Sequence, residues 1–356
     1  MKKIVFIFLV LILASFSFKL IENHNKKSGF NIEETPFSIY QLIEGCNSVK
    51  HSSGSTIIIP NNAFDCKGNI VIKYREFRDP YDMIINNIPM HLNKNGKRHQ
   101  LESGGMFEIK AECDGREIEP KQGKEIQVRY KCDKHIEELR VYKMSDQGRY
   151  WQENPIEIIE MSFDKNNNSS SRPDLWGNEA IPQETTNIES DDGDVYQSVI
   201  TMNHPYFEGI FKGINISKMG IYNYDAIIKE LGVIPIIGNT FIINNKDSIQ
   251  TTTYSPYDLK EKSDLNPNNN EIESFYVIYD SLNTTYQYSR EDLKERFVIR
   301  PNNKANIFAL LKNGFIATFS MARFNSIEWG DFRNKNFTFK LDLDPLKPTK
   351  KEDLKK

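Results

Sequence analysis

The chain has 356 residues, a formal net charge of −3 and 38% hydrophobic residues. That length suffices for two ordinary domains, and 22 Phe and 16 Tyr supply the apolar volume of a sizeable core. The sequence has no basic stripe, which argues against nucleic acid as a partner.

Residues 1–17, MKKIVFIFLVLILASFS, have the pattern of a secretory signal peptide. Lys2 and Lys3 precede an apolar run from Ile4 to Leu13, and small residues lead to a cleavage point after Ser17. The run is too short for a mature membrane anchor, although an uncleaved N-terminal anchor is the alternative. No other segment is apolar enough to cross a membrane. We therefore expect an exported protein that is periplasmic, surface-associated or secreted.

Residues 18–36 are polar and lack periodicity, which predicts an irregular lead-in. Residues 37–163 contain a series of strand patterns. In MFEIKAE, for example, Phe107, Ile109 and Ala111 alternate with Glu108 and Lys110. Such a period of two with one polar side is typical of an antiparallel sheet with one wet face. We predict a β-sandwich here, with strands in residues 55–59, 69–77, 106–112, 125–130, 138–144 and 149–154.

Glycines mark two special backbone positions in this region. Gly104 and Gly105 predict a positive φ or the close approach of a neighbouring strand. Asp114-Gly115 predicts a tight hairpin turn.

The four cysteines, Cys46, Cys66, Cys113 and Cys132, are disulfide candidates, because an even count in an exported chain favours pairing. Three pairings are open. The predicted strand directions place Cys113 and Cys132 at one end of a sheet, which favours that bond and leaves Cys46–Cys66. A zinc ligand pair, Cys132 with His135, is the alternative, but the half-motif has no second half.

Residues 164–195 are rich in Asn, Ser, Asp and Pro, and we predict a polar linker. Its ESDDGD stretch, residues 189–194, has acidic oxygens that suit calcium but lacks the spacing of a calcium loop. We interpret it as a solvated acidic loop and expect no metal.

Residues 196–343 predict a second β-sandwich-like domain, followed by a charged, solvated tail at residues 344–356. The clearest hairpin is NIFALLKNGFIATFS, which turns at Lys312-Asn-Gly314. Two short helices are expected, one over residues 223–232 and one opened by Ser289 and Asp292 at capping-box spacing. The fold prediction is all-β: two antiparallel β-sandwich domains joined by a polar linker, with one or two short helices in the second.

Residues 54–64, GSTIIIPNNAF, resemble the start of the ZU-five domain of ankyrins, netrin receptors and tight-junction scaffolds. Gly54, residues 57–59, Pro60, Ala63 and Phe64 match its pattern in order. SGGMFEI and QGKEIQV resemble later strands of ZU-five-like domains in exported bacterial proteins. The resemblance covers roughly residues 37–163 and implies a β-sandwich that serves in protein contact or scaffolding.

Some ZU-five relatives cleave themselves at a His-(Phe/Tyr)-Ser triplet. Here His204 precedes Pro205-Tyr206, and His51 precedes Ser52-Ser53, so the resemblance does not extend to self-cleavage.

Motifs of known chemistry are missing from the sequence. It has no Gly-x-Ser-x-Gly elbow, no His-Glu-x-x-His and no phosphate-binding glycine loop, so we expect no cofactor and assign no catalytic residue. No nucleophile pairs in a recognisable pattern with any of the six histidines, His24, His51, His91, His99, His135 and His204. Two carboxylates that meet in a cleft remain an open alternative.

Tyrosines in two polar stretches offer sites for stacking on sugars or for anchoring a protein: Tyr254, Tyr257, Tyr286 and Tyr288. Because Tyr286 and Tyr288 share one strand face, we expect these two to pack in the core.

The sequence thus predicts a non-enzymatic exported cell-envelope or surface protein that acts as a protein-interaction or scaffold module. Its partner would be a protein or glycan of the envelope. The alternatives are a glycan- or peptide-directed hydrolase with unrecognised catalytic carboxylates, and a structural component of an envelope assembly.

Overall fold

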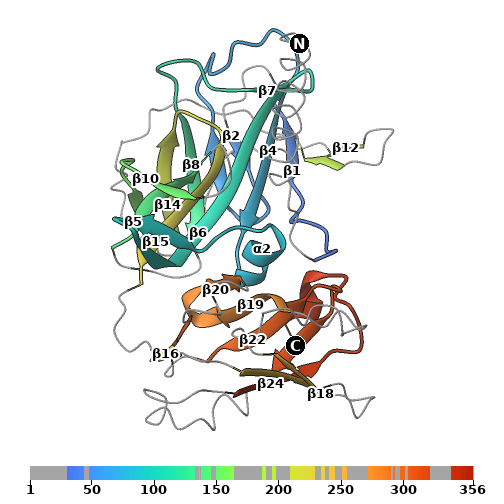
Figure 1. Ribbon diagram of the computed structural model, residues 1–356. Coiled ribbons are helices and arrows are strands. Elements are labelled where there is room, and N and C mark those ends of the chain that lie inside the picture. The colour runs from blue at the N-terminus through green and yellow to red at the C-terminus, as the bar shows by residue number, and fades with distance from the viewer. Residues whose placement is uncertain are drawn as a thin grey trace, which may run out of the picture.

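A computed structural model describes residues 30–43, 48–132, 136, 138–145, 150–163, 187–189, 195–197, 209–228, 234–236, 240–244, 251–254, 272–289, 292, 297–300, 304–320 and 338–355. The fold is all-β, as predicted, with strands β1 to β24 and one α-helix among the described residues. Figure 1 shows two bodies of β-sheet, with the helix α2 (Pro80–Ile85) where they meet. None of the described helices has the length and apolarity needed to cross a membrane.

The first body contains two sheets. One sheet has the order β1 (Ser38–Gln41), β4 (Ile70–Phe77), β6 (Lys97–Cys113), β15 (Gly220–Ile227), β9 (Arg140–Met144) and β10 (Trp151–Asn154), and β5 (His91–Lys94) and β7 (Arg116–Ile118) also pair with β6. The other has the order β11 (Ile159–Phe163), β14 (Gly209–Ile216), β8 (Ile126–Cys132), β3 (Thr56–Ile58) and β2 (Ser48–Lys50). All these pairs are antiparallel.

The alternating residues of these strands form the core between the two sheets. Phe107 and Ile109 of β6 pack in one cluster with Val128 of β8 and Tyr222 of β15, and each is at most 1% exposed. Burial of large apolar side chains from both layers is the main favourable term in such a sandwich. The predicted inward-facing residues of 106–112 and 125–130 are confirmed. The predicted wet side is wrong at Glu108 and Gln127, which are only 6% and 7% exposed because each has a polar partner, Arg75 and Asn215.

The predicted turn at Asp114-Gly115 is also confirmed. Asp114 has φ 47° and Gly115 has φ 78°, and β6 and β7 pair antiparallel on either side. Two consecutive positive φ values define the turn type that matches the twist of a two-residue hairpin.

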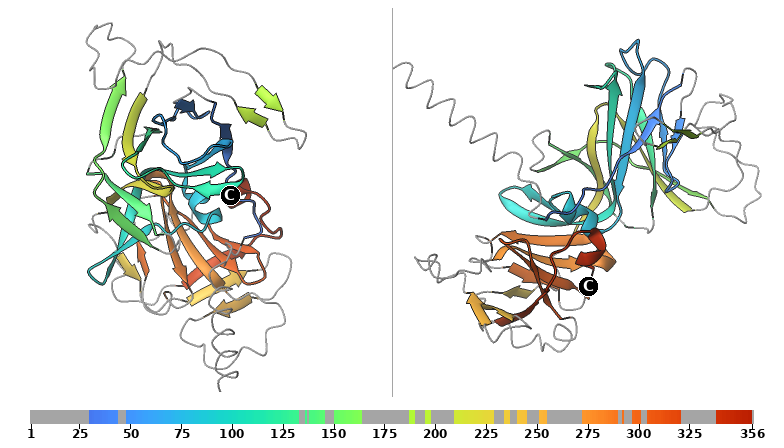
Figure 2. Two further views of the ribbon diagram at one scale, coloured as in Figure 1. Left: turned by 90° about the horizontal axis from the view of Figure 1, so that it is seen from above. Right: turned by 90° about the vertical axis from the view of Figure 1, so that its right-hand side faces the viewer.

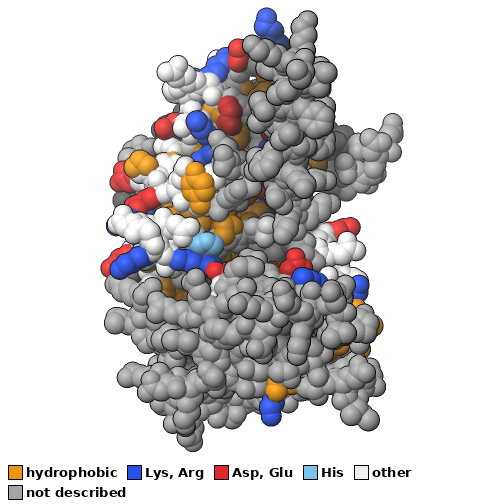
Figure 3. Space-filling view, in the orientation of Figure 1, with side chains coloured by type: hydrophobic (Ala, Val, Ile, Leu, Met, Phe, Trp, Pro, Cys, Tyr) orange, Lys and Arg blue, Asp and Glu red, His pale blue; other side chains and the backbone are white. Residues whose placement is uncertain are grey.

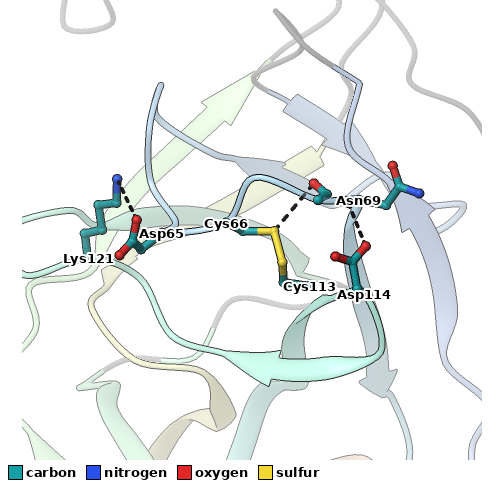
Figure 4. The surroundings of a disulfide bond; sticks show 7 residues. Asp65, Cys66, Asn69, Cys113, Asp114 and Lys121 are labelled. Carbon is teal, nitrogen blue, oxygen red and sulfur yellow. Dashed lines mark hydrogen bonds and ion pairs between the residues drawn. A yellow bond between two sulfur atoms is a disulfide. The ribbon is translucent and has the colours of Figure 1, made fainter.

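The disulfide pairing inferred from strand direction is wrong. Cys113 bonds to Cys66, with a Cα–Cα distance of 6.1 Å, as Figure 4 shows. The inference placed Cys113 and Cys132 in one sheet, but β6 and β8 belong to opposite layers. Cys66 precedes β4, whose Ile70 pairs with Cys113. Cys132 is buried in β8, and Cys46 lies outside the described residues.

The predicted domain boundary also needs correction. β14 and β15 were assigned to the second domain, yet each lies inside a sheet of the first body. The polar stretch at residues 164–195 therefore separates β11 from β14, which are neighbours in one sheet. Within it, β12 (Asn187–Glu189) pairs with β13 (Val195–Gln197). The acidic residues 190–194 lie outside the described part.

The expected helix at residues 223–232 is wrong, because residues 220–227 form β15. Its local signals were Asn223 as a cap and Gly232 as a stop. The alternation of Tyr222 and Tyr224 is the stronger signal, since both are buried in the core between the two sheets. Packing in a sheet overrides weak helix propensity. At the other predicted helix, the Ser289 backbone N–H donates to Asp292 Oδ2 over 2.8 Å, as the capping-box spacing predicts. Residues 293–296, where this helix would continue, lie outside the described residues.

The second body is built on a seven-stranded sheet in the order β18 (Thr251–Tyr254), β17 (Thr240–Asn244), β24 (Thr338–Leu343), β23 (Ile316–Phe319), β22 (Asn306–Leu311), β19 (Ile272–Tyr279) and β20 (Thr284–Ser289). A two-stranded sheet pairs β16 (Ile234–Ile236) with β21 (Phe297–Ile299). The β22–β23 hairpin is confirmed, with Gly314 at φ 82° in its turn. One pair, β17 with β24, is parallel, which corrects the prediction of purely antiparallel sheets.

The charged tail is not a freely solvated end. Residues Lys351–Leu354 form a 3-10 turn, η4, and Leu354 is only 2% exposed. The second view of Figure 2 shows this C-terminal turn at the meeting point of the two bodies. Leu354 is the apolar residue that attaches this turn to the protein, although the lysines around it in the sequence are typical of a solvated tail.

Candidate functional site at the junction of the two bodies

Helix α2 connects the two bodies, and its sequence specifies where it begins. Asp79 is the N-cap, and its Oδ1 accepts hydrogen bonds from the backbone N–H groups of Tyr81 (3.1 Å) and Asp82 (3.0 Å). Pro80 occupies the first turn, where no backbone donor is needed. The stretch Asp-Pro-Tyr-Asp is therefore a helix-start signal that the sequence analysis missed.

The apolar side of α2 attaches it to the second body. Tyr81, Ile84 and Ile85 pack in one cluster with Tyr276 of β19 and Phe308 of β22. Phe30 of the lead-in lies 5.9 Å from the Tyr276 ring, centroid to centroid. Residues 30–36, the described part of the lead-in, contain no helix or strand, as predicted, and this contact shows that they also belong to the junction.

A polar contact joins β6 to β20 beside the helix. Gln100 Nε2 donates to Thr285 O over 2.7 Å, and Arg98 Nη2 donates to Gln287 O over 2.8 Å. Thr284 Oγ1 donates to the backbone oxygen of Leu101 over 2.5 Å. Backbone groups of both bodies are thus satisfied by the other body, which fixes their relative position.

The C-terminal turn adds ion pairs to the junction. Lys351 Nζ lies 2.7 Å from Asp82 Oδ1 and 3.3 Å from Asp79 Oδ2, and Lys355 Nζ lies 2.8 Å from Asp79 Oδ2. Burial raises the pKa of Asp79, but the hydrogen bond from Lys355 and the neighbouring charges outweigh it, so the pKa is lowered overall. Figure 3 shows acidic and basic side chains along the boundary between the bodies.

A cleft of about 280 Å³ opens at this junction. Three segments line it: residues 78–80 at the start of α2, residues 103–105 of β6 with the Tyr130 ring, and the turn after β19 with Asp280, Ser281 and Asn283. Residues from both bodies therefore form one site. A larger hollow of about 770 Å³ lies against the lead-in, α2 and residues 349–351.

The Gly-Gly pair forms one wall of the cleft. The β6–β15 register shifts so that Gly104 and Gly105 together lie opposite Tyr224, which is a β-bulge. Gly105 has φ 147°, and a Cβ atom there would lie 2.2 Å from Tyr130 Cε1. Both expectations for this pair, positive φ and close approach, are confirmed. The bulge lets the Tyr130 ring lie directly against the strand beside the cleft.

The acidic groups of the cleft differ in their environments. Burial raises the pKa of Asp280, the charge of Asp79 raises it further, and Lys355 lowers it. Among the described residues, no cation lies within salt-bridge distance of Asp280, and its printed side-chain contact is Asn306 Nδ2 at 3.4 Å. Asn283 Oδ1 is buried with no hydrogen-bond donor in the described part. Of these two acceptors, the Asp280 carboxylate is exposed, whereas the Asn283 amide oxygen is enclosed by the protein.

A polar network beside the cleft brings a histidine, His51, into contact with a hydroxyl group. His51 Nδ1 lies 2.8 Å from Ser53 Oγ, which donates to Glu76 Oε1 over 3.0 Å. Tyr74 and Arg78 also donate to Glu76. The sequence contains no recognisable pattern for this His51–Ser53 contact, which arises because the β2–β3 turn folds the His-Ser-Ser stretch back on itself.

This network lacks the geometry of a proton relay. A Ser-His-acid triad uses both ring nitrogens of the histidine, one for each partner. Here the same Nδ1 faces Ser53 and lies 3.7 Å from Glu76. Burial, which outweighs the charge of Glu76, lowers the pKa of His51, so its ring is neutral near pH 7. The arrangement holds Arg78 in place beside the cleft.

Other predicted residues lie elsewhere. Tyr286 and Tyr288 are buried in the second core at 5% and 6% exposure, so the packing prediction is confirmed. Tyr254 ends β18, and Tyr257, His24, His135 and His204 lie outside the described residues. Within the described part, no cluster of three His, Cys, Asp or Glu side chains is placed to hold a metal ion.

No protein-family model, curated protein or solved structure matches this chain. The ZU-five resemblance of residues 37–163 therefore stays a prediction.

Proposed function

We propose that this is an exported protein whose two β-sheet bodies act together as an interaction module, with the junction cleft as its binding site. The observation that carries the proposal is the cleft itself, which needs residues of both bodies. An interaction site commonly presents a few convergent polar groups on a rigid frame.

Export is supported by two independent features. Residues 1–17 have the order of a signal peptide, and the Cys66–Cys113 disulfide suits an oxidising compartment. Envelope proteins, including their glycan-bearing members, are therefore the proposed partners.

The experiment is surface crosslinking in intact cells, followed by recovery of the tagged protein and identification of bound partners. We expect the chain in the envelope or medium, with a partner enriched over an unrelated exported control. Recovery from the cytosol with reduced Cys66 and Cys113, or absence of any enriched envelope partner, would contradict the proposal.

A hydrolase is the second candidate, favoured by Asp79 and Asp280. These carboxylates line one cleft, and their pKa values shift in opposite directions, which is a pattern of acid and base pairs. Against it, Asp79 already caps α2 and binds two lysines. Turnover of a glycan or peptide library that disappears in Asp280→Asn would establish this candidate. Equal turnover by Asp280→Asn and the parent protein would remove it.

A further inference from the structure

Strand β5 and the start of β6, residues 91–100, form an antiparallel ribbon that contacts β20 of the second body. In the register of this ribbon His91 lies directly opposite Gln100, so the two side chains share one face. Arg98, two positions before Gln100, lies on the same face. Gln100 and Arg98 donate to backbone oxygens of β20 over 2.7 and 2.8 Å. The face that carries His91 is therefore the face that contacts the second body.

The opposite face of the ribbon belongs to the first body. Leu92 and His99 are paired in the register and lie on this other face. Leu92 is buried in one cluster with Trp151 of β10. The ribbon thus separates two histidines: His91 lies on the face toward the second body, and His99 does not.

The surroundings of His91 disfavour a charge on its ring. The side chain is half-buried at the contact, and the nearby Arg98 on the same face is a cation. Asp292 acts in the opposite direction, but it lies 3.8 Å from Arg98 Nη1. Lys94, on the other face, pairs with Glu153 at 3.0 Å. Burial and the charge of Arg98 outweigh Asp292 and lower the pKa of His91 to about 4.

The sign of this effect fixes its consequence. An opened junction returns His91 to water, where its ordinary pKa is 6.5. As pH falls below 6.5, the opened state takes up a proton that the closed state accepts only near pH 4. The contact between ribbon and β20 is therefore at full strength above the higher value and weakens progressively toward the lower one.

We propose that the junction is an acid-sensitive switch, in which protonation of His91 releases the β5–β6 ribbon from β20 and loosens the two bodies from each other. Histidine is suited to this role because its charge changes in a range of mildly acidic pH that an exported protein can meet. The two-body cleft described above would be complete at neutral pH and disrupted in acid.

The test is hydrogen exchange of the purified full chain, followed by mass spectrometry at about pH 7 and about pH 4.5 and corrected for the intrinsic pH dependence of exchange. Peptides from residues 91–100 and from β20 should exchange at least about tenfold faster at the lower pH, since the opening equilibrium follows the difference between the two pKa values. Strand β8, in the core of the first body, is the internal reference and should keep its protection.

The variants are His91→Gln and His91→Leu, neither of which can be charged, with His99→Gln as the matched control on the opposite face. Both His91 variants should lose the acid-induced acceleration, and the control should retain it. Two variants are used so that a packing defect in one of them does not decide the result. Equal acceleration in the parent and both His91 variants, loss of acceleration in His99→Gln, or joint acceleration of β8 and β20 in the parent would overturn the inference.

This inference goes beyond the proposed function and does not depend on it, because the exchange experiment uses no partner. If the junction opens in acid as expected while cells yield no envelope partner, the switch stands and the interaction module falls. If a partner is recovered while exchange is independent of His91, the module stands and the switch falls.

Discussion

Gly105 lies in the β6 bulge, where the backbone and the Tyr130 ring meet. In Gly105→Ala, the new Cβ would lie 2.2 Å from Tyr130 Cε1 and would also carry the unfavourable φ of 147°. We expect a loss of about 2–4 kcal/mol in the free energy of unfolding, from overpacking plus backbone strain. Gly123→Ala is the control, because Gly123 has φ 77° but open space around it, and should lose only about 1 kcal/mol. Urea denaturation compares the two, and equal losses would contradict the steric argument.

Asp225 is a buried carboxyl in the first body, at 0% exposure, with Oδ1 unpartnered in the described part and Oδ2 bound to Asn223 Nδ2. Burial raises its pKa well above the usual value of 3.8. The folded state therefore holds the proton after the unfolded chain has released it. Stability falls as pH rises above the unfolded pKa.

Asp225→Asn removes this pH-dependent loss. We expect the variant to be more stable than the parent near neutral pH, and we expect this difference to disappear as pH drops below the unfolded pKa. Denaturation at several pH values measures it. A variant that is less stable than the parent near neutral pH would show that Asp225 is a stabilising, ionised group.

Among the elements, the C-terminal turn η4 is the one whose sequence most conceals its role. Leu354, at 2% exposure, packs in one cluster with Phe30 and Tyr81, while Leu346 a few residues earlier is 69% exposed. Leu354→Ala should lower the free energy of unfolding by about 2–4 kcal/mol, and Leu346→Ala by less than about 0.5 kcal/mol. Chemical denaturation distinguishes them. Similar small effects would mean that the turn does not anchor the junction.

The elements also show what local pattern predicts well. The alternation of β6 and β8 identified the side chains that enter the core between the two sheets, because successive side chains of a strand point to opposite faces. The β15 segment was predicted wrongly as a helix, because Asn223 and Gly232 are acceptable helix ends. Its pairing with β6 on one side and β9 on the other depends on residues far away in the sequence. The same holds for the cleft. The sequence predicted an unusual backbone at Gly104 and Gly105, but their position in one cleft with Asp280 depends on how the two bodies meet.

At the scale of the whole molecule, the disulfide joins Cys66 and Cys113 of the first body, which are separated by 47 positions in the sequence. Its removal in a Cys66→Ser, Cys113→Ser double variant should cost about 4 kcal/mol, the loop-closure entropy that the bond removes from the unfolded chain. Denaturant titration with and without reductant checks this, and a non-reducing peptide map should join the Cys66 and Cys113 peptides. Identical stability with and without reductant would contradict the loop-closure account.

By itself, the sequence determined the all-β class, the positions of most strands, the hairpin turns and the inward-facing side chains. These depend on periodicity and on glycine conformations, which act over a few residues. Only the tertiary structure decided that β14 and β15 return to the first body, that Cys66 meets Cys113, and that Asp79 and Asp280 line one cleft. The physical reason is that each of these contacts joins residues far apart in the chain, and competing pairings with equal local patterns are separated only by how the whole core packs.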